Sequence, residues 1–283
     1  MERPKLQLPD GFADEKLPKG VFSHSQYSTY KKCPQAYYRE YVLGIRSPMS
    51  QAAFKGVAVH GGIEHTLRAV MAGSPTPDVA EGRQKVSELF DAKAEQVQGW
   101  DPDEPRGRSK DLAIAAYSVW HAKALVERGI HPVGVEEPFI KRIGTVPVVG
   151  YIDLIDRVTP AGVSSVPHPG HLVIADIKTG KTAWSQDELD RDPQFTLYSL
   201  ARGVRQVRVD CLAFLKAGPT YSAKEGTRDE HAHRVLVEDY EETVDLIKRG
   251  IFPRAPIDSW GCSGKWCAHW NRCRGNPDNY GGG

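Results

Sequence analysis

Two aspartates and a lysine are the residues of this sequence whose types and spacing best suit chemistry. Asp153 lies inside a predicted strand, Asp176 ends the next strand, and Lys178 follows at the second position. Because side chains alternate along a strand, Asp176 and Lys178 share one face and Ile177 points to the other. Paired carboxylates bind Mg²⁺ or Mn²⁺ and a lysine orients water, which suits metal-assisted phosphodiester hydrolysis. Taken alone, an Asp-x-Lys pattern is more often a surface ion pair.

Two further pairs of polar residues have the spacing of one helix face. His60 and Glu64 are four residues apart in a predicted helix and could add a nitrogen and an oxygen donor to the same site. The alternative for His60 is a histidine satisfied within its helix. Gln194 and Tyr198 are also four apart, on the helix after Lys178, and both can hydrogen-bond a phosphate or a base. Their alternative is ordinary helix-surface polarity.

The cysteines are five in number, and four of them stand near the two ends of the chain: Cys33, Cys262, Cys267 and Cys273. The three late ones have the spacings C-x4-C and C-x5-C, which suit a ligand cluster better than a secreted disulfide framework. A zinc ion held by four cysteines, or by three with His269, is one interpretation, and free buried thiols are another. Cys211 falls in an apolar strand, where we expect a core residue.

The elements that must position these residues change in type along the chain. Residues 1–22 are predicted to be an irregular leader, and Ser23 caps a tyrosine-rich helix that Pro34 splits. Helical periodicity is predicted at 52–72, 79–98, 109–128, 185–203 and 238–250. Strands are predicted as a meander from 131 to 155, at 171–178, at 207–216 and near 233–237, with a polar turn at 159–170. This order predicts an α/β (α+β) fold, a mixed β-sheet core flanked by helices, with an N-terminal helical region and a C-terminal cysteine-rich segment.

Composition excludes several classes of protein. The chain has 283 residues, of which 40% are hydrophobic, and its net charge is +1, so it is neither a polybasic tail nor an acidic solvating segment. It has neither a signal peptide nor the ~18 apolar residues of a membrane span, and we expect a soluble, cytoplasmic protein. Positive charge is local, because residues 248–274 carry six Lys or Arg against Asp258, interleaved with Trp260, Trp266 and Trp270. Such a segment suits single-stranded DNA, although the tryptophans could instead cover the cysteines as a small core.

Four motifs in one order point to a family: Gly56-Val-Ala-Val-His60, Gly150-Tyr-Ile-Asp153, Ile174-Ala-Asp176-Ile-Lys178-Thr-Gly180 and Gln194-Phe-Thr-Leu-Tyr198. Together they resemble the RecB-like branch of the PD-(D/E)XK nuclease superfamily. The resemblance also covers the opening segment from Ser25 to Pro34 and the late cysteines, so it spans about residues 23–274. It implies a restriction-endonuclease-like core. Within 23–274 we expect a mainly helical part at 23–130, a catalytic α/β core at 131–237 and a C-terminal helix with the cysteines at 238–274, followed by a tail at 275–283.

The resemblance implies roles for individual residues. His60, Asp153 and Asp176 would bind Mg²⁺ or Mn²⁺ with the carbonyl of Ile177, Lys178 would be the catalytic lysine, and Gln194 and Tyr198 would position DNA beside the two aspartates. Glu64 has no firm role in that scheme. The expected activity is a metal-dependent deoxyribonuclease, in particular an exonuclease in phage or prophage recombination or DNA end processing, which would work in the bacterial cytoplasm. The expected partners are DNA, single-stranded or with free ends, and a recombination protein. A helicase motif of the type G-x-x-x-x-G-K-[ST] is absent from the sequence.

The cysteines resemble those of the iron–sulfur nucleases of the AddB and CRISPR-associated exonuclease groups. There, one early and three late cysteines bind a 4Fe-4S cluster, which implies that Cys33, Cys262, Cys267 and Cys273 are cluster ligands here. The spacing departs from that pattern, because those groups usually have two residues, not four, between the first two late cysteines. Two other functions stay open: a non-catalytic nucleic-acid-binding or assembly protein on a nuclease fold, and a structural module held by Zn²⁺.

Overall fold

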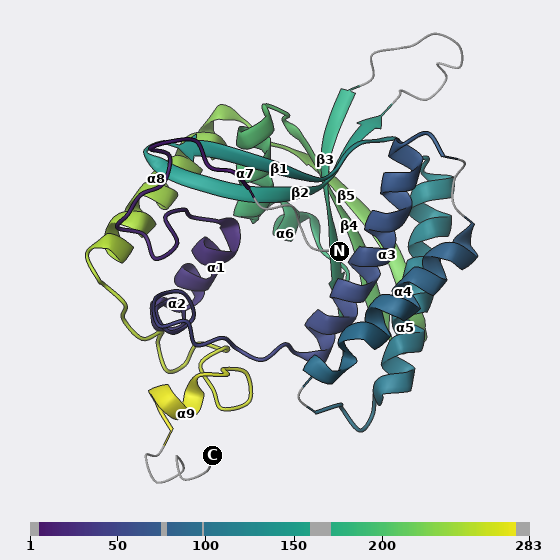
Figure 1. Ribbon diagram of the computed structural model, residues 1–283, viewed down its shortest axis with the longest axis horizontal. Coiled ribbons are helices and arrows are strands. Elements are labelled where there is room, and N and C mark those ends of the chain that lie inside the picture. The colour runs from purple at the N-terminus through teal and green to yellow at the C-terminus, as the bar shows by residue number, and fades with distance from the viewer. Residues whose placement is uncertain (1–5, 75–77, 98, 159–170, 276–283) are drawn as a thin grey trace. The chain divides into compact units, whose positions relative to one another are not determined.

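Five strands form one mixed sheet in the computed structural model, which describes residues 6–74, 78–97, 99–158 and 171–275 (Figure 1). The strands are β1 (Pro132–Ile143), β2 (Val146–Val158), β3 (His171–Gly180), β4 (Gln206–Leu215) and β5 (Gly218–Thr227), in the spatial order β1-β2-β3-β4-β5. β3 pairs antiparallel with β2 and parallel with β4, and β4 pairs antiparallel with β5. The predicted mixed α/β class is therefore confirmed, while the predicted turn at 159–170 lies outside the described residues.

The helices have these bounds: α1 His24–Lys32, α2 Pro34–Tyr37, α3 Gln51–Met71, α4 Val79–Lys93, α5 Arg106–Trp120, α6 Gln186–Arg191, α7 Pro193–Arg202, α8 Glu230–Lys248 and α9 Trp270–Cys273. Ser23 caps α1 by accepting a hydrogen bond from the Gln26 N–H, and the helix stops before Pro34, both as predicted. The predicted helix at 185–203 is two helices, because Asp192 caps a new helix that begins at Pro193. None of the helices in the described ranges is long and apolar enough to cross a membrane.

Two predictions after residue 216 are wrong. Between the strands predicted at 207–216 and near 233–237 no further strand is predicted, yet this segment contains β5, which lacks apolar alternation but pairs with β4 from Gly218 to Thr227. The strand predicted at 233–237 is the start of α8, whose buried side chains recur with helical spacing, at Leu236, Tyr240, Val244 and Ile247. Main-chain hydrogen bonds to β4 define the first segment as a strand, and an apolar period that extends over nineteen residues defines the second as a helix. A window of five residues shows neither feature.

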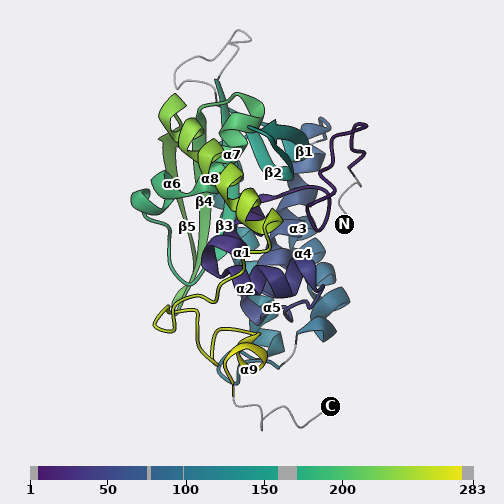
Figure 2. The same cartoon turned by 90° about the vertical axis from the view of Figure 1, so that its left-hand side faces the viewer.

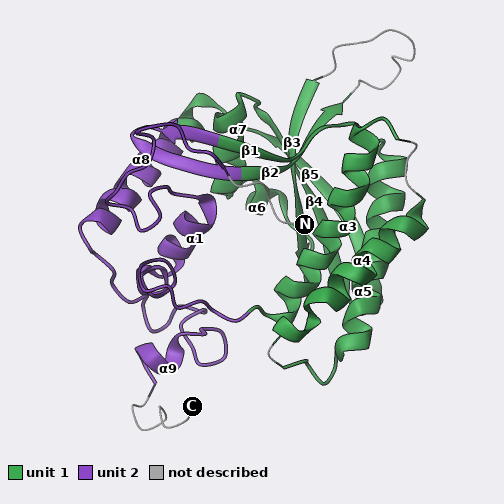
Figure 3. Cartoon of the chain, viewed as in Figure 1, with its two compact units in different colours: residues 1–5, 49–139, 151–233 green, residues 6–48, 140–150, 234–283 purple. Residues whose placement is uncertain are grey.

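The chain divides into two compact units (Figure 3). Unit 1 comprises residues 1–5, 49–139 and 151–233, and unit 2 comprises residues 6–48, 140–150 and 234–283. The strands β1 and β2 belong to both, because their shared hairpin end at 140–150 falls in unit 2. All the residues predicted to form the acidic site lie in unit 1, and the four cysteines near the chain ends lie in unit 2.

In unit 1, helices cover both faces of the sheet. The helices α3, α4 and α5 pack together, and α3 and α5 also contact the sheet (Figures 1 and 2). Their apolar core takes Leu154, Ala175, Ile177 and Leu212 from the strands. The helix α7 contacts β3 and β4, and α6 contacts β5. Because neighbouring residues of a strand point to opposite faces, the side chains beside Ile177 face away from the α3–α5 core.

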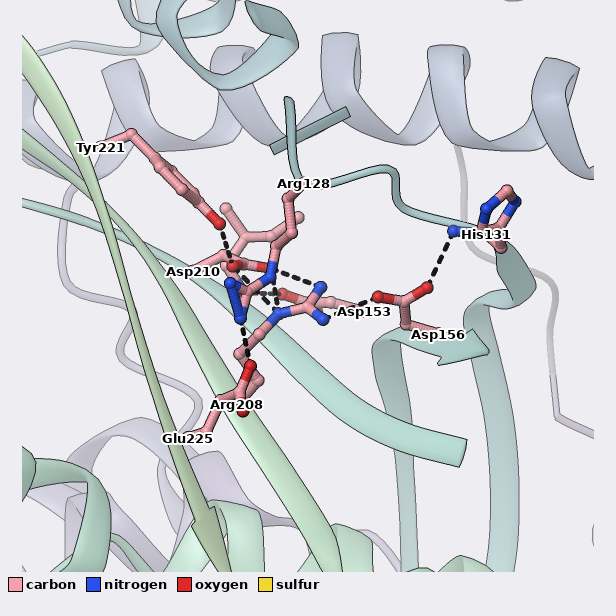
Figure 4. A network of polar contacts seen from close by, with 9 residues as sticks. Arg128, His131, Asp153, Asp156, Arg208, Asp210, Tyr221 and Glu225 are labelled. Atoms are coloured by element: carbon pink, nitrogen blue, oxygen red, sulfur yellow. Dashed lines mark hydrogen bonds and ion pairs between the residues drawn. The ribbon is translucent and has the colours of Figure 1, made fainter. Parts of the chain in front are cut away.

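A buried charge network surrounds Arg208 (Figure 4). It lies on the same face of the sheet as Ile177, because Asp210 is the register partner of Ile177 on β4. Arg208 Nη1 lies 2.6 Å from Asp156 Oδ2, and its Nη2 lies 2.9 Å from Asp210 Oδ2. Tyr221 donates to Asp210 at 2.6 Å, and the backbone N–H of His131 donates to Asp156 at 2.8 Å. Burial works to lower the pKa of Arg208, but the two carboxylates outweigh it and raise the pKa. The network joins β2 to β4 across β3, and β4 to β5. Loss of one partner would leave a buried charge uncompensated, so the network favours this register of the strands.

In unit 2, aromatic side chains and hydrogen bonds hold the early helices against late segments. Tyr27 stacks on Tyr240 with ring centroids 4.6 Å apart. Tyr30 donates to the Ile251 carbonyl at 2.7 Å, and Arg39 donates to the Arg272 carbonyl at 3.1 Å. The segments that carry the early cysteine and the late cysteines therefore belong to one packed unit.

Candidate active site

The acidic residues sit where β3 parts from β2. The two strands pair from Val158 opposite His171 to Leu154 opposite Ala175, and Asp153 and Asp176 are the next residue on each strand. Beyond this point, Oδ2 of Asp153 accepts a hydrogen bond from the Ile177 N–H at 3.2 Å. A carboxylate thus takes the place of a main-chain partner and is fixed beside Asp176.

Lys178 and Gln194 complete the arrangement around Asp176. Lys178 Nζ lies 2.7 Å from Asp176 Oδ2 and 2.6 Å from the side-chain oxygen of Gln194. The Gln194 amide nitrogen donates to Asp176 Oδ1 at 3.0 Å and to the Tyr198 hydroxyl at 2.7 Å. Asp192 caps α7 by accepting from the Gln194 N–H at 2.6 Å, which sets the first turn of that helix. The predicted strand residues and the predicted helix residues therefore meet.

His60 reaches the same carboxylates from α3. Its Nδ1 lies 3.6 Å from Asp153 Oδ2. The close approach of the helix depends on Gly56, one turn earlier, where an added Cβ would lie 2.5 Å from the hydroxyl oxygen of Thr179. The other residue of the predicted pair, Glu64, accepts from Arg68 Nε at 2.8 Å within its own helix.

Tyr198 is buried, whereas one of the two interpretations from the sequence placed it on the helix surface. The alternative of helix-surface polarity is wrong for this residue, because its exposed fraction is 5% and its ring packs edge-on against Phe139 at 6.0 Å. Its hydroxyl accepts from Gln194, so Tyr198 supports the amide that contacts Asp176 and Lys178.

The electrostatics of the site follow from burial and from like charges. Burial raises the pKa of Asp153 well above its usual range, and the charges of Asp176 and Glu136 raise it further. Burial works to lower the pKa of Lys178, but Asp176, followed by Asp153, outweighs it and the pKa rises. Lys178 is therefore held as an ammonium among carboxylates that repel one another.

Glu136 is a residue of this site that the sequence analysis missed. It lies on β1 with an exposed fraction of 8%, and its charge acts on Asp153. The sequence carries no signal for it, because Glu136 and Glu137 are adjacent in a strand and either could be the outward residue.

The donor atoms of the site are those that Mg²⁺ and Mn²⁺ accept, namely carboxylate oxygens with one imidazole nitrogen. In the described part of the chain, no three His, Cys, Asp or Glu side chains stand ready around one point for a metal ion. The carboxylates instead interact with other groups of the site: Asp176 pairs with Lys178 and accepts a hydrogen bond from Gln194, and Asp153 accepts one from the Ile177 N–H. The donor chemistry and the crowded negative charge fit a divalent cation.

The four cysteines near the chain ends lie in unit 2, where the described residues show no group of them already placed to hold a metal ion. All are free, partly buried thiols, and burial raises the pKa of Cys267, followed by the charges of Cys33, Cys262 and Cys273. His269 is engaged elsewhere, because its Nε2 lies 3.1 Å from Glu40 Oε1 and 3.3 Å from the Ser47 hydroxyl. As expected, Cys211 is buried in β4.

Two tryptophans of the late segment are unusually exposed. The exposed fractions of Trp260 and Trp266 are 75% and 59%, and their rings meet edge to face with centroids 6.4 Å apart. Lys265 places its ammonium 5.0 Å from the Trp266 ring centroid. The interpretation that these tryptophans form a small core over the cysteines is therefore wrong for this pair.

Comparison with known proteins identifies a family for the chain and solved structures of similar fold. Residues 21–274 match the family model of the PD-(D/E)XK nuclease superfamily. A crystal structure of a candidate exonuclease from Eubacterium rectale is similar in fold, with a TM-score of 0.55, 12% identity, and coverage of 91% of this chain and 93% of that chain. The crystal structure of SSO0001 has a TM-score of 0.34 and 14% identity, covering 70% of this chain and 97% of that chain. Among curated proteins, none matches the sequence closely.

Proposed function

The chain belongs to the PD-(D/E)XK nuclease superfamily, and on that premise we propose that it is a metal-dependent DNA exonuclease of the RecB-like branch. The observation that carries the proposal is the 2.7 Å pair of Lys178 and Asp176, with Gln194 bonded to both members. A structural ion pair at a strand end would not need a glutamine from a separate helix to orient both charges.

The metal ligands would be the side chains of His60, Asp153 and Asp176 with the carbonyl of Ile177. A bound Mg²⁺ or Mn²⁺ supplies charge that stabilises the phosphate and activates water. The protein's own part is positional. Lys178 presents a fixed positive charge beside Asp176, and Gln194 holds that lysine while Tyr198 holds Gln194.

Single-stranded DNA with a free end is the substrate that we infer. The exposed rings of Trp260 and Trp266 offer stacking faces for bases, and Lys265 adds positive charge beside them. Stacking on an aromatic ring needs an unpaired base. This favours single strands, and DNA end processing or recombination with a partner protein in a bacterial cytoplasm is the setting that we propose.

The cysteines support assignment to the iron–sulfur type of this branch. The charges of Cys33, Cys262 and Cys273 contribute to raising the pKa of Cys267, whereas His269 is hydrogen-bonded to Glu40 and Ser47. Four thiolates without a free histidine favour a 4Fe-4S cluster over Zn²⁺ bound by three cysteines and a histidine. The cluster would join an early segment of unit 2 to a late one.

Linear and circular single-stranded DNA of one sequence separate the proposed activity from its rivals. With Mg²⁺ or Mn²⁺ we expect the purified chain to release short products from the linear form only, and with EDTA we expect none. Cleavage of the circle would contradict the exonuclease mode. Binding without cleavage of either form, in any of the metals, would favour the non-catalytic binding protein.

A further inference from the structure

A cavity of about 480 Å³ opens beside His60 in unit 1. Its walls include Gly56 and His60 from α3, Thr179 from β3 and Glu136 from β1. Glu64 also lines it, but that carboxylate is bound to Arg68. Glu136 therefore brings a buried carboxylate to a cavity that already holds an imidazole of the proposed metal site.

The backbone at Glu136 is shaped to direct that side chain inward. Its φ is +47°, and within the described ranges no other residue except glycine has a positive φ. Side chains of a regular strand alternate, yet Val135 and Glu136 are both buried, with exposed fractions of 3% and 8%. Val135 joins the apolar core, whereas Glu136 lines the cavity. An irregularity in a strand beside an active site is a common way of turning one side chain towards the site.

The neighbouring residue shows the contrast. Glu137 lies in the same strand, but it is partly exposed and pairs with Arg202 at 2.7 Å. Glu136 instead faces the cavity, and its charge, like that of Asp176, helps to raise the pKa of Asp153, so three carboxylates share this part of the site. Carboxylates crowded in this way are stabilised by a divalent cation bound between them.

We propose that Glu136 is a further acidic residue of the divalent-cation site, binding the cation from the side of the cavity that it shares with His60. The proposal rests on the proposed function and adds to it a residue that sets metal affinity. The alternative is a purely structural role, in which Glu136 would only shape the irregular strand.

Calorimetric titration of Mn²⁺ into the metal-free chain tests the role without relying on cleavage. Three variants are compared with the parent: Glu136→Gln, Glu136→Gly and, as the matched control, Glu137→Gln. Loss of a residue that supports a metal site commonly lowers affinity by about 10-fold to 100-fold. We expect a loss of that size for both Glu136 variants and none for Glu137→Gln. Glycine is informative because it adopts a positive φ without strain and preserves the strand irregularity.

The outcomes separate the two claims. If the parent binds Mn²⁺ and both Glu136 variants bind it as tightly, Glu136 is not part of the metal site, and the proposed function stands. If Glu136→Gly binds normally and only Glu136→Gln fails to fold, the residue has a structural role and the proposal is overturned. A parent chain that binds no Mn²⁺ would overturn the metal-dependent function itself.

Discussion

Lys178 Nζ lies 2.6 Å from the side-chain oxygen of Gln194, which joins a sheet residue to a residue of helix α7. The same amide gives its nitrogen to Asp176 and Tyr198, so one glutamine fixes both charges of the strand motif. The lysine is therefore held in position before any substrate arrives. Preorganised charge of this kind is where enzymes gain much of their rate enhancement.

Removing the Tyr198 hydroxyl tests that chain of support. Tyr198→Phe keeps the ring against Phe139 but loses the hydrogen bond from Gln194, which contributes about 1 kcal/mol. We expect the cleavage rate to fall by roughly fivefold, with little change in melting temperature. Gln194→Ala should cost more, because both Lys178 and Asp176 lose a partner. An unchanged rate for both variants would remove Gln194 and Tyr198 from the account.

Neutralising Asp153 should stabilise the metal-free chain. Burial and nearby carboxylates raise the pKa of Asp153 in the folded state, so the folded state binds this proton more tightly than the unfolded state does. Its contribution to stability is therefore present below the ordinary carboxyl pKa and is lost as pH rises through the raised pKa. Asp153→Asn removes this loss of stability at high pH, because the asparagine amide carries no charge. At neutral pH we expect its free energy of unfolding to exceed that of the parent by about 1 kcal/mol, with no excess near pH 4.

Urea denaturation in EDTA at several pH values measures this difference. Asp187→Asn is the control, because Asp187 is an exposed residue of α6 whose ion pair with Arg191 contributes at most about 0.5 kcal/mol. Equal stability of Asp153→Asn and the parent across the range would show that the Asp153 carboxylate is not destabilised by its surroundings.

The cysteine proposal predicts a coloured, iron-containing protein. Anaerobic purification should give absorption near ~400 nm, with iron and sulfide in equal amounts. Cys33→Ser should lose the metal, while Cys211→Ala should keep it, because Cys211 is a buried residue of β4 in the other unit. Metal analysis that finds one zinc and no iron would replace the cluster with a zinc site. A chain without metal would leave the thiols as ordinary residues.

The exposed tryptophans predict a loss of DNA affinity without a loss of fold. Each base stacked on an aromatic ring contributes about 1–3 kcal/mol, so Trp260→Ala with Trp266→Ala should weaken binding of a fluorescent oligothymidine at least tenfold. Ile257→Ala is the matched control, since Ile257 is an exposed apolar residue of the same segment. Equal affinity of the double variant and the control would show that the tryptophans do not contact DNA.

Residues whose positions follow from the local period of a strand or helix could be predicted from the sequence. Asp176 and Lys178 share a face because strands alternate, and Gln194 meets Tyr198 because helices repeat about every four residues. That Asp153 adjoins Asp176 also follows from antiparallel neighbours. Glu136 could not be found in this way, since its inward direction depends on one backbone angle.

Long-range pairing explains the other failures. β5 is defined by its hydrogen bonds to β4, and its own side chains show no apolar alternation. In the charge network, Arg208 also bonds to Asp156, which lies 52 positions earlier in the sequence. Neither relationship leaves a pattern within a short window of sequence.

The most direct test of the account is the rate at which nucleotides are released from end-labelled linear single-stranded DNA in Mn²⁺. The parent chain, Asp176→Asn, Lys178→Met and the control Asp187→Asn are measured at equal concentration, with melting curves to verify folding. We predict release by the parent and by Asp187→Asn, and a loss of at least about a thousandfold for the two site variants, because they remove charge that stabilises the transition state. Substantial release by a folded Asp176→Asn protein, at a rate near that of the parent, would contradict the assignment of this site as the nuclease centre.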